Sequence, residues 1–322
     1  MKKLLGVDLG GATIKIGLFQ SNLEKIAEKK IATEAHKGSN HVLHLMASGI
    51  QALLEEHTLS TYDIASMGMG IPGLLDRENG ISLHSPNFTN WRNVPIGLWF
   101  ENKLQIPVVI DNDVRMNLYG EWKQGIGKEK QNIILLTLGA SLGASVLIDG
   151  SMYYGCTENA GEIGHMHLYP KGRPCYCGSS GCLGRYVSAA GMIETVREKL
   201  NQKRSSILKD WTKNDIKNMT AKMISEAFDA DDAVAKETLQ ETGTYLGYGL
   251  VNLIHLYNPE MIIIGGGIAE AGERLLYSAR KIVEKNTLEL PQKNCTITLG
   301  KLGDSAGMVG AALYGYEYAS KK

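Results

Sequence analysis

The chain has 322 residues, 43% of them hydrophobic, and its 34 lysines and arginines balance 34 aspartates and glutamates. This length suffices for two domains, and the apolar content excludes a largely disordered chain. Zero formal charge removes the attraction that nucleic acids or an anionic membrane surface would exert, so we expect neither as a partner. The 37 glycines exceed the usual ~7% and indicate tight turns and backbone that lies close to a ligand.

The N-terminus lacks the features of a signal peptide, and no run of about 18 apolar residues predicts a membrane span. We therefore expect a cytoplasmic protein. Three of the five cysteines lie close together. An odd number of cysteines in a reducing compartment argues against a disulfide framework and favours metal binding or burial.

The first third of the chain predicts alternating strands and helices. Period-two alternation on both sides of a glycine turn indicates a hairpin, and the apolar spacing after it is helical. The expected elements are strands at 4–9 and 14–19, a helix at 41–57, strands at 67–71 and 106–110, and a helix at 114–123.

A similar plan begins again near residue 132, with a strand at 133–136, a turn of small residues at 139–145 and a returning strand at 146–148. This weak internal repeat predicts two related α/β domains. The expected remainder is an irregular insertion at 151–188, mostly helices at 189–256, strands at 260–264 and 296–302, and helices at 271–283 and 306–318.

Two glycine turns and one glycine run are candidate ligand-binding segments. Gly10 and Gly11 follow Asp8, and the N–H groups of such a turn can bind phosphate while the carboxylate holds Mg²⁺ through water. An ordinary hairpin turn is the alternative. The turn from Gly139 to Gly143 repeats the pattern, so two turns could grip a polyphosphate. The run at 265–267 precedes a helix and is a candidate contact for the sugar and base of a nucleotide.

A pair of carboxylates ends the strand at 106–110. If strand geometry persists, alternation places Asp111 and Asp113 on one side and Asn112 opposite. A carboxylate at the carboxyl end of a strand suits a general base. An Asx turn and helix N-cap is the alternative interpretation of this tripeptide.

His165, Cys175, Cys177 and Cys182 have spacing typical of a metal site. Three thiolates and one imidazole form a closed tetrahedral set for structural zinc, with no open position for a catalytic water. Three unlinked buried thiols are the alternative, but cysteine is scarce elsewhere in the chain. His167 is the competing histidine, and we expect it at the surface.

With these motifs in place, the chain resembles the ROK family (repressor, open reading frame, kinase) of sugar kinases and sugar-responsive repressors in the actin-like ATPase superfamily. The resemblance runs nearly end to end. The matching segments are 8–11, 70–73, 85–87, 112–113, 139–143, 162–165, the clustered cysteines, 258–260 with 265–267, and 303–307.

The resemblance implies a two-domain α/β fold of the actin-like ATPase (ribonuclease H-like) type, with a central cleft and a small zinc-bearing insertion. An N-terminal domain would span 1–118, joined by a C-terminal helix at 305–322. A C-terminal domain would span 119–304 and carry the zinc motif at 165–182. A homodimer is also implied.

The resemblance further implies roles for single residues. Asp113 would be the catalytic base that takes the proton from the 6-hydroxyl of a hexose. The sugar would be bound by Asn87, Asn112, Glu162 and His165, the last also a zinc ligand. ATP phosphates and Mg²⁺ would lie against Asp8, Gly10, Gly11, Thr13, Gly139 and Gly143, and adenosine near Gly266 and Gly267.

The chain departs from the family pattern at three places. The threonines usual after the first glycine pair and after the glycine of the second turn are Ala12 and Ala140 here, and Ser141 replaces that turn's second glycine. The sugar-contacting glutamate of the family's Cys-Leu-Glu is Gly184, followed by Arg185. Glucose, N-acetylmannosamine, fructose and allose kinases share the remaining motifs, so the sugar stays open.

These features favour an ATP-dependent hexose kinase whose two domains close over sugar and nucleotide. A sugar-binding ROK protein with weak or no kinase activity is the alternative, motivated by Ala12, Ala140 and Gly184. A sugar-responsive transcription regulator is expected to carry a DNA-binding domain before the kinase-like body, and only seven residues precede Asp8.

Overall fold

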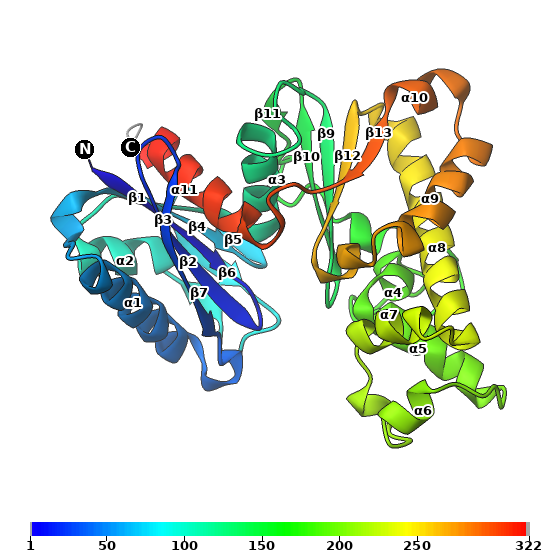
Figure 1. Ribbon diagram of the computed structural model, residues 1–322. Coiled ribbons are helices and arrows are strands. Elements are labelled where there is room, and N and C mark those ends of the chain that lie inside the picture. Colours follow the sequence, from blue (N-terminus) through cyan, green and yellow to red (C-terminus); the bar gives the residue numbers. More distant parts are fainter. Residues whose placement is uncertain (1, 320–322) are drawn as a thin grey trace. The chain divides into compact units, whose positions relative to one another are not determined.

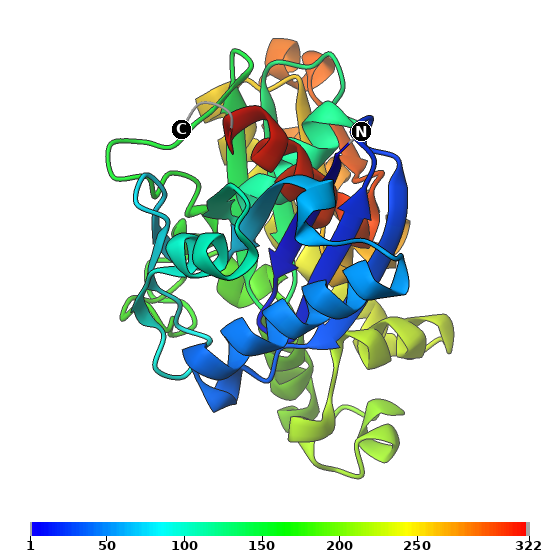
Figure 2. The same cartoon turned by 90° about the vertical axis from the view of Figure 1, so that its left-hand side faces the viewer.

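The computed structural model describes residues 2–319 (Figures 1 and 2). Contacts divide the chain into two compact units: unit 1 comprises Met1–Glu129, Tyr154–Asn159 and Lys301–Lys322, and unit 2 comprises Lys130–Tyr153 and Ala160–Gly300. The domain boundary expected at residue 118 lies inside helix α3 (Asp113–Lys123), all of which belongs to unit 1. The helix expected at 305–322 is α11 (Ala306–Ala319), and residues 320–322 lie outside the described residues.

A five-stranded sheet forms the centre of unit 1, with the order β3-β2-β1-β4-β8. Strands β1, β4 and β8 are parallel, so their carboxyl ends meet at one edge, where Asp8 pairs with Gly70 and Gly70 pairs with Asp111. The strands are β1 (Lys3–Leu9), β2 (Thr13–Phe19), β3 (Lys25–Ala32), β4 (Ile64–Ile71) and β8 (Val108–Asn112).

Alternation along β1 decides which helix each side chain meets. Leu5 and Val7 pack in one cluster with helix α1 (Ser39–Glu56), which crosses in front of β1–β3 in Figure 2. Gly6 faces α11, and a Cβ there would lie 2.0 Å from the carbonyl oxygen of Met308. Asp8 therefore lies on the α11 face of the sheet.

Unit 1 also contains elements that the sequence did not predict. Strand β3, at the sheet edge, mixes lysine and glutamate with apolar residues without regular alternation. The strands of a second sheet are only three or four residues long. The second sheet has β5 (Leu74–Asp76), β6 (Ile81–His84) and β7 (Arg92–Val94); helix α2 (Ile96–Leu104) and the 3₁₀ turns η1 (Ala35–Lys37), η2 (Thr61–Asp63) and η6 (Gly303–Ser305) complete the unit.

The sheet of unit 2 has the order β11-β10-β9-β12-β13, which repeats the plan of unit 1. The internal repeat predicted from the sequence is therefore confirmed. The strands are β9 (Ile133–Leu138), β10 (Leu142–Ile148), β11 (Ser151–Met152), β12 (Met261–Gly265) and β13 (Thr296–Leu299). The last is shorter than the strand expected at 296–302.

Helices cover one face of this sheet, where Ile134, Leu136 and Leu138 pack against residues of α5 and α8 (Figure 1). Within residues 2–319, no helix has the length and apolar character needed to cross a membrane. Unit 2 contains η3 (Ile163–His165), α4 (Gly184–Val187), α5 (Ala189–Asn201), α6 (Leu208–Trp211), η4 (Ile216–Asn218), α7 (Ala221–Asp229), α8 (Ala233–Tyr257), η5 (Gly267–Ala271), α9 (Glu273–Asn286) and α10 (Glu289–Asn294).

Candidate functional site

Asp8, the next-to-last residue of β1, is buried. Lys15, its cross-strand partner on β2, places its Nζ 3.8 Å from Asp8 Oδ2 and 3.4 Å from Asp304 Oδ1. Burial raises the pKa of Asp8 to about 6, with Lys15 opposing this effect and Asp304 adding to it. A Cβ at Gly307 would lie 2.7 Å from Asp8 Cγ, so the glycine leaves room for the carboxylate. A buried carboxylate of this kind is stabilised in its charged form by a bound cation.

The glycine turn after Asp8 is held from both sides. The Gly10 N–H donates to the carbonyl of Thr13 at 3.0 Å, and the buried Thr33 hydroxyl donates to the Gly10 carbonyl at 2.7 Å. Gly11 is exposed, and a Cβ there would lie 3.8 Å from the Cβ of Asn87. The structure therefore places Asn87 beside this turn.

The tripeptide 111–113 does not keep strand geometry, so the expected alternation is wrong. Strand β8 ends at Asn112, and Asp113 is the first residue of α3. Asn112 Oδ1 accepts hydrogen bonds from the backbone N–H groups of Val114 at 3.0 Å and Arg115 at 3.3 Å. The N-cap interpretation is thus confirmed for Asn112, and the cap directs Asp113 away from the strand.

Asp113 is partly buried at the same sheet edge as Asp8. Burial raises the pKa of Asp113 to about 7, the Asp8 carboxylate raises it further, and the Val114 N–H acts in the opposite direction. A carboxylate with a pKa near neutrality is suited to accepting a proton at physiological pH.

Asp111, the other candidate base, has no exposed surface. Its oxygens accept hydrogen bonds from Arg115 Nε at 2.6 Å, the Tyr154 hydroxyl at 2.9 Å and Arg77 Nη1 at 3.5 Å. A carboxylate enclosed in this way cannot reach a substrate proton, so Asp113 is the stronger candidate.

The second glycine turn, in unit 2, is shorter than expected. It comprises only residues 139–141, and Gly143 lies within β10, where it pairs with Thr137. The prediction that Gly143 belongs to the turn is therefore wrong. The Gly139 carbonyl accepts a hydrogen bond from the Ala189 N–H at 2.9 Å, which joins the turn to the start of α5.

The glycine run after β12 lies against the end of β9. Gly266 has a φ of +84°, and a Cβ there would lie 2.4 Å from the Leu138 carbonyl oxygen, so both conformation and space require glycine. Gly267 faces open space. The structure thus brings this run next to the turn that begins at Gly139.

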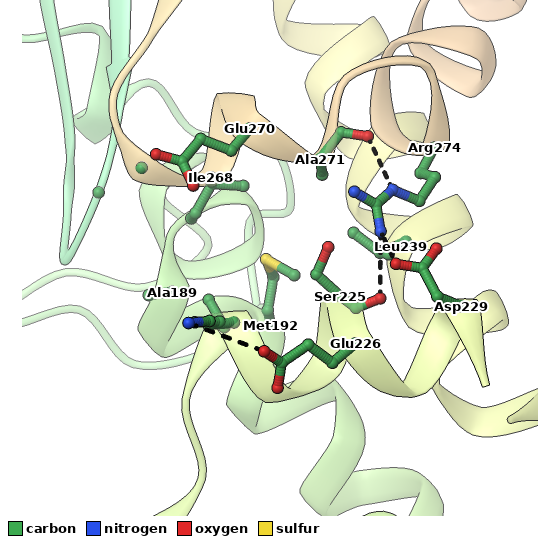
Figure 3. Close-up of a pocket in the computed structure, with 14 residues that line it drawn as sticks. Ala189, Met192, Ser225, Glu226, Asp229, Leu239, Ile268, Glu270, Ala271 and Arg274 are labelled. Carbon is green, nitrogen blue, oxygen red and sulfur yellow. Dashed lines mark hydrogen bonds and ion pairs between the residues drawn. The ribbon is translucent and has the colours of Figure 1, made fainter. Parts of the chain in front are cut away.

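A cavity of about 510 Å³ opens in unit 2, with Gly139 and Gly267 in its wall. Figure 3 shows this cavity and labels Met192, Leu239 and Ile268 among its lining residues. Met192, Leu239 and Ile268 supply apolar surface. The other lining residues are Ala189, Ala221, Lys222, Ser225, Glu226, Asp229, Glu270, Ala271 and Arg274. A cavity with apolar walls and a few polar groups is typical of a site for a flat organic ligand.

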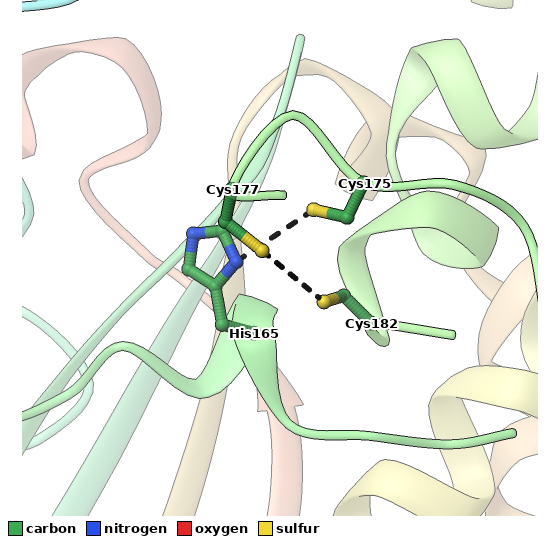
Figure 4. Close-up of side chains that lie close together, drawn as sticks. All are labelled: His165, Cys175, Cys177 and Cys182. Carbon is green, nitrogen blue, oxygen red and sulfur yellow. Dashed lines mark hydrogen bonds between the residues drawn. The ribbon is translucent and has the colours of Figure 1, made fainter. Parts of the chain in front are cut away.

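The predicted metal ligands converge on one point (Figure 4). One ligand atom from each of His165, Cys175, Cys177 and Cys182 lies within 4.8 Å of all the others. His165 Nδ1 lies 3.8 Å from Cys175 Sγ, and Cys177 Sγ lies 3.8 Å from Cys182 Sγ. His167 is exposed and outside the cluster, as expected.

The other nitrogen of His165 points toward Glu162, with Nε2 4.0 Å from Glu162 Oε2. Both side chains are largely exposed and available to a ligand. A Cβ at Gly184 would lie 3.2 Å from the Gly164 carbonyl oxygen, so position 184 adjoins the turn that carries His165.

Sequence reasoning missed the groups that surround these residues. Arg77 and Tyr154 meet at Asp111 from distant parts of the chain, and Glu158 binds Arg77. Lys15 adjoins Asp8. Of the contacts of Asp111, only the ion pair between Asp111 and Arg115 could have been predicted from local sequence, because residues four apart are neighbours on a helix.

The two five-stranded sheets have the same strand order, and each contains a hairpin with a glycine turn. This arrangement is that of the actin-like ATPase fold class. A sequence profile of the ROK family matches residues 4–316. The chain belongs to the ROK family, and the α/β fold class expected from the resemblance is confirmed.

Individual relatives carry different names. The glucokinase of Halalkalibacterium halodurans is 33% identical over 95% of this chain and 92% of its own length. The xylose repressor of Caldicellulosiruptor bescii is 28% identical over 95% of this chain and 76% of that protein. The crystal structure of a ROK family glucokinase from Streptomyces griseus, in complex with glucose and AMPPNP, has a TM-score of 0.85 and 28% identity, covering 98% of this chain and 99% of that one.

Proposed function

We propose that the protein is an ATP-dependent hexose kinase with Asp113 as its general base. The position of Asp113 carries the proposal: it is the one partly buried carboxylate of the tripeptide 111–113, at the sheet edge shared with Asp8 and the first glycine turn. Two curated glucokinases, at 33% and 31% identity, support this activity.

In the reaction, the oxygen of the sugar 6-hydroxyl attacks the γ-phosphorus of ATP. The O–H bond breaks and its proton passes to a carboxylate oxygen of Asp113, while the bond from the γ-phosphorus to the bridging oxygen breaks and releases ADP. Phosphoryl transfer depends mostly on positioning and charge neutralisation.

Both glycine turns would donate N–H groups to the ATP phosphates. The donors would come from residues 11–12 of unit 1 and 140–141 of unit 2, because the Gly10 and Gly139 N–H groups already bond within their turns. The cavity of unit 2 would take the adenosine, with Gly266 and Gly267 beside it. Asp8 would hold the Mg²⁺ of Mg²⁺–ATP, because its buried carboxylate has a raised pKa and therefore gains from a cation. The ion would neutralise phosphate charge.

Asn87 and Asn112 of unit 1 and Glu162 and His165 of unit 2 would bind the sugar. Asn112 uses its Oδ1 to cap α3, so its NH₂ group is the part that would donate to a sugar hydroxyl. The exposed Glu162 carboxylate would accept from hydroxyls. We further propose a cytoplasmic homodimer, on the family resemblance.

The cysteine cluster fits structural zinc. Zn–S bonds of about 2.3 Å in a tetrahedron place two sulfurs about 3.8 Å apart, which is the separation of Cys177 and Cys182. Zinc bound to His165 Nδ1 would leave Nε2 protonated, facing Glu162 and the sugar. The metal would thus orient a sugar-binding side chain without joining the chemistry.

The direct test measures ADP release with a panel of hexoses and amino sugars, with glycerol and no sugar as controls. At least one sugar should give steady turnover, and NMR of the product should show a phosphate at carbon 6. Sugar binding without ADP release from any sugar would instead support the sugar-binding alternative.

Gly184→Glu is expected to improve turnover of a common hexose such as glucose, because it restores a charged sugar contact that typically contributes ~1.5–3 kcal/mol. Gly184→Ala is the matched control: it adds only the Cβ that approaches the Gly164 carbonyl at 3.2 Å. Relative kcat/KM across the sugar panel is the measurement. An unchanged preference in Gly184→Glu would mean that position 184 does not face the sugar.

The double variant Ala12→Thr, Ala140→Thr is expected to lower the KM for ATP several-fold and leave sugar preference unchanged. Both alanines are exposed in their turns, so a threonine fits and can donate its hydroxyl to phosphate. Ala12→Val, Ala140→Val has the same shape without the hydroxyls. Equal KM values for the two double variants would contradict a role for the hydroxyls.

A further inference from the structure

Residues 154–159 belong to unit 1, although the chain on both sides belongs to unit 2. We call these six residues the strap. Its flanks are fixed on β10: the Tyr153 N–H donates to the Val146 carbonyl at 2.9 Å, and a Cβ at Gly161 would lie 2.8 Å from the Ala144 carbonyl oxygen. The strap is therefore a short loop with both ends held.

Two arginines bind the strap within unit 1. Arg77, in the turn after β5, donates from Nε and Nη2 to the two Glu158 carboxylate oxygens at 3.1 and 2.6 Å. Arg115 Nη1 donates to the Glu158 carbonyl at 2.9 Å. The Arg77 hydrogen bonds lower the pKa of Glu158, so the two-bond contact between Arg77 and Glu158 is an ion pair. The Arg77 guanidinium also lies 3.7 Å from the centre of the Tyr154 ring.

The same arginines and Tyr154 meet at Asp111. Arg115 Nε reaches one carboxylate oxygen at 2.6 Å, and the Tyr154 hydroxyl reaches the other at 2.9 Å. Burial raises the pKa of Tyr154, and the Asp111 carboxylate adds to this, so the hydroxyl stays protonated and donates. Two cations and two carboxylates thus form a balanced cluster that the reaction itself does not use.

Asp111 connects this cluster to the proposed base. One of its oxygens accepts the backbone N–H of Asn112 at 2.6 Å. Asn112 caps α3, and Asp113 is the first residue of that helix. Arg115, held by Asp111 and by the strap, lies in the first turn of the same helix. The backbone that aims the Asp113 carboxylate is therefore held at both of its ends.

We propose that Tyr154 and Glu158 are positioning residues, which fix Asp111 and Arg115 and thereby the direction of the Asp113 carboxylate. The inference rests on the proposed role of Asp113 as the base. Reacting groups must be held within about 0.5 Å of productive geometry, and a 1 Å misplacement can cost about 10²-fold in rate. Only residues 159–161 separate Glu158 from the proposed sugar ligand Glu162, so the strap also tethers the sugar-binding turn.

Tyr154→Phe tests this inference, because it keeps the ring beside Arg77 and removes the hydroxyl that donates to Asp111 and also bonds with the Tyr314 hydroxyl. We expect kcat to fall about tenfold, with the KM for ATP nearly unchanged. Hydrogen exchange of backbone amides in residues 112–116 should be several-fold faster than in the wild type. Tyr153→Phe, at the exposed neighbouring tyrosine, should match the wild type in every measurement.

A second variant tests the route. In an Asp111→Asn background, Tyr154→Phe should cause little further loss of kcat, because the two residues act through one hydrogen bond. If the two substitutions instead lowered kcat independently, so that their fold-losses multiplied, the proposal would be overturned. A wild-type kcat in Tyr154→Phe would also overturn it, whether or not amide exchange changed. If the wild type phosphorylates no sugar, the proposed function fails, and amide exchange then decides whether the strap holds residues 112–116.

Discussion

Replacing Asp113 with asparagine is expected to lower kcat by at least ~10²-fold and to leave the Kd for the sugar nearly unchanged. The amide is close in size to the carboxylate and can still accept the Val114 N–H, which Asp113 Oδ1 accepts at 3.0 Å, so α3 should begin as before. It cannot take the proton of the sugar hydroxyl. Steady-state kinetics and calorimetric sugar binding measure the two effects separately.

The pH dependence of the reaction is a second test of Asp113 as the base. Because the pKa of Asp113 is raised to about 7, kcat/KM for the sugar should fall as pH decreases below about 7, where the base becomes protonated. When Mg²⁺–ATP is bound, the cation would neutralise the Asp8 carboxylate, which raises the pKa of Asp113. The pKa of Asp113 should then be lower, so kcat should begin to fall at a lower pH than kcat/KM.

Asp210→Asn serves as the control, because Asp210 is an exposed aspartate on α6 of unit 2. It should keep wild-type kcat and pH dependence. Turnover of Asp113→Asn within a few-fold of the wild type would show that Asp113 is not the base. Asp111 would not replace it, because its carboxylate is fully buried and already accepts three side-chain hydrogen bonds.

The parts of the fold that the sequence predicted are those whose cause is local. Apolar runs marked β1, β4 and β9, and the Gly10–Gly11 pair marked the first turn, because strands and glycine turns depend on residues near one another. The cysteine spacing indicated the metal cluster for the same reason, since a short loop brings the four ligands together.

The parts that were missed depend on contacts between distant residues. Gly143 looks like a turn residue, yet its ladder partner Thr137 keeps it in β10. Tyr154 and Arg77 both contact Asp111, although more than 30 residues separate each of them from it along the chain. The periodicity of the sequence does not predict contacts between such distant residues. Strand alternation predicts Asp113 on the same side as Asp111, but Asn112 accepts the backbone N–H groups of Val114 and Arg115, so a helix begins at Asp113.

Cys177→Ser is expected to abolish zinc binding and to raise the KM for the sugar strongly, with a smaller effect on the KM for ATP. A serine hydroxyl is a poor replacement for a thiolate, so the tetrahedral set would be incomplete. His165 would then lose the contact that fixes its ring, and its Nε2 would no longer be held 4.0 Å from Glu162. Metal analysis should find about one zinc per wild-type chain and far less in the variant.

Cys295→Ser separates loss of the metal from loss of a thiol, because Cys295 lies outside the cluster and should leave zinc content and sugar KM unchanged. In Cys177→Ser, the KM for the sugar should rise much more than the KM for ATP, and this difference distinguishes a role in sugar binding from a general loss of structure. The cluster adjoins Glu162, whereas the proposed adenosine cavity is lined by Gly139, Gly267 and helices of unit 2. A variant without zinc that keeps the wild-type KM for the sugar would therefore show that His165 is held by the protein alone, and that the metal stabilises the loop without serving sugar binding.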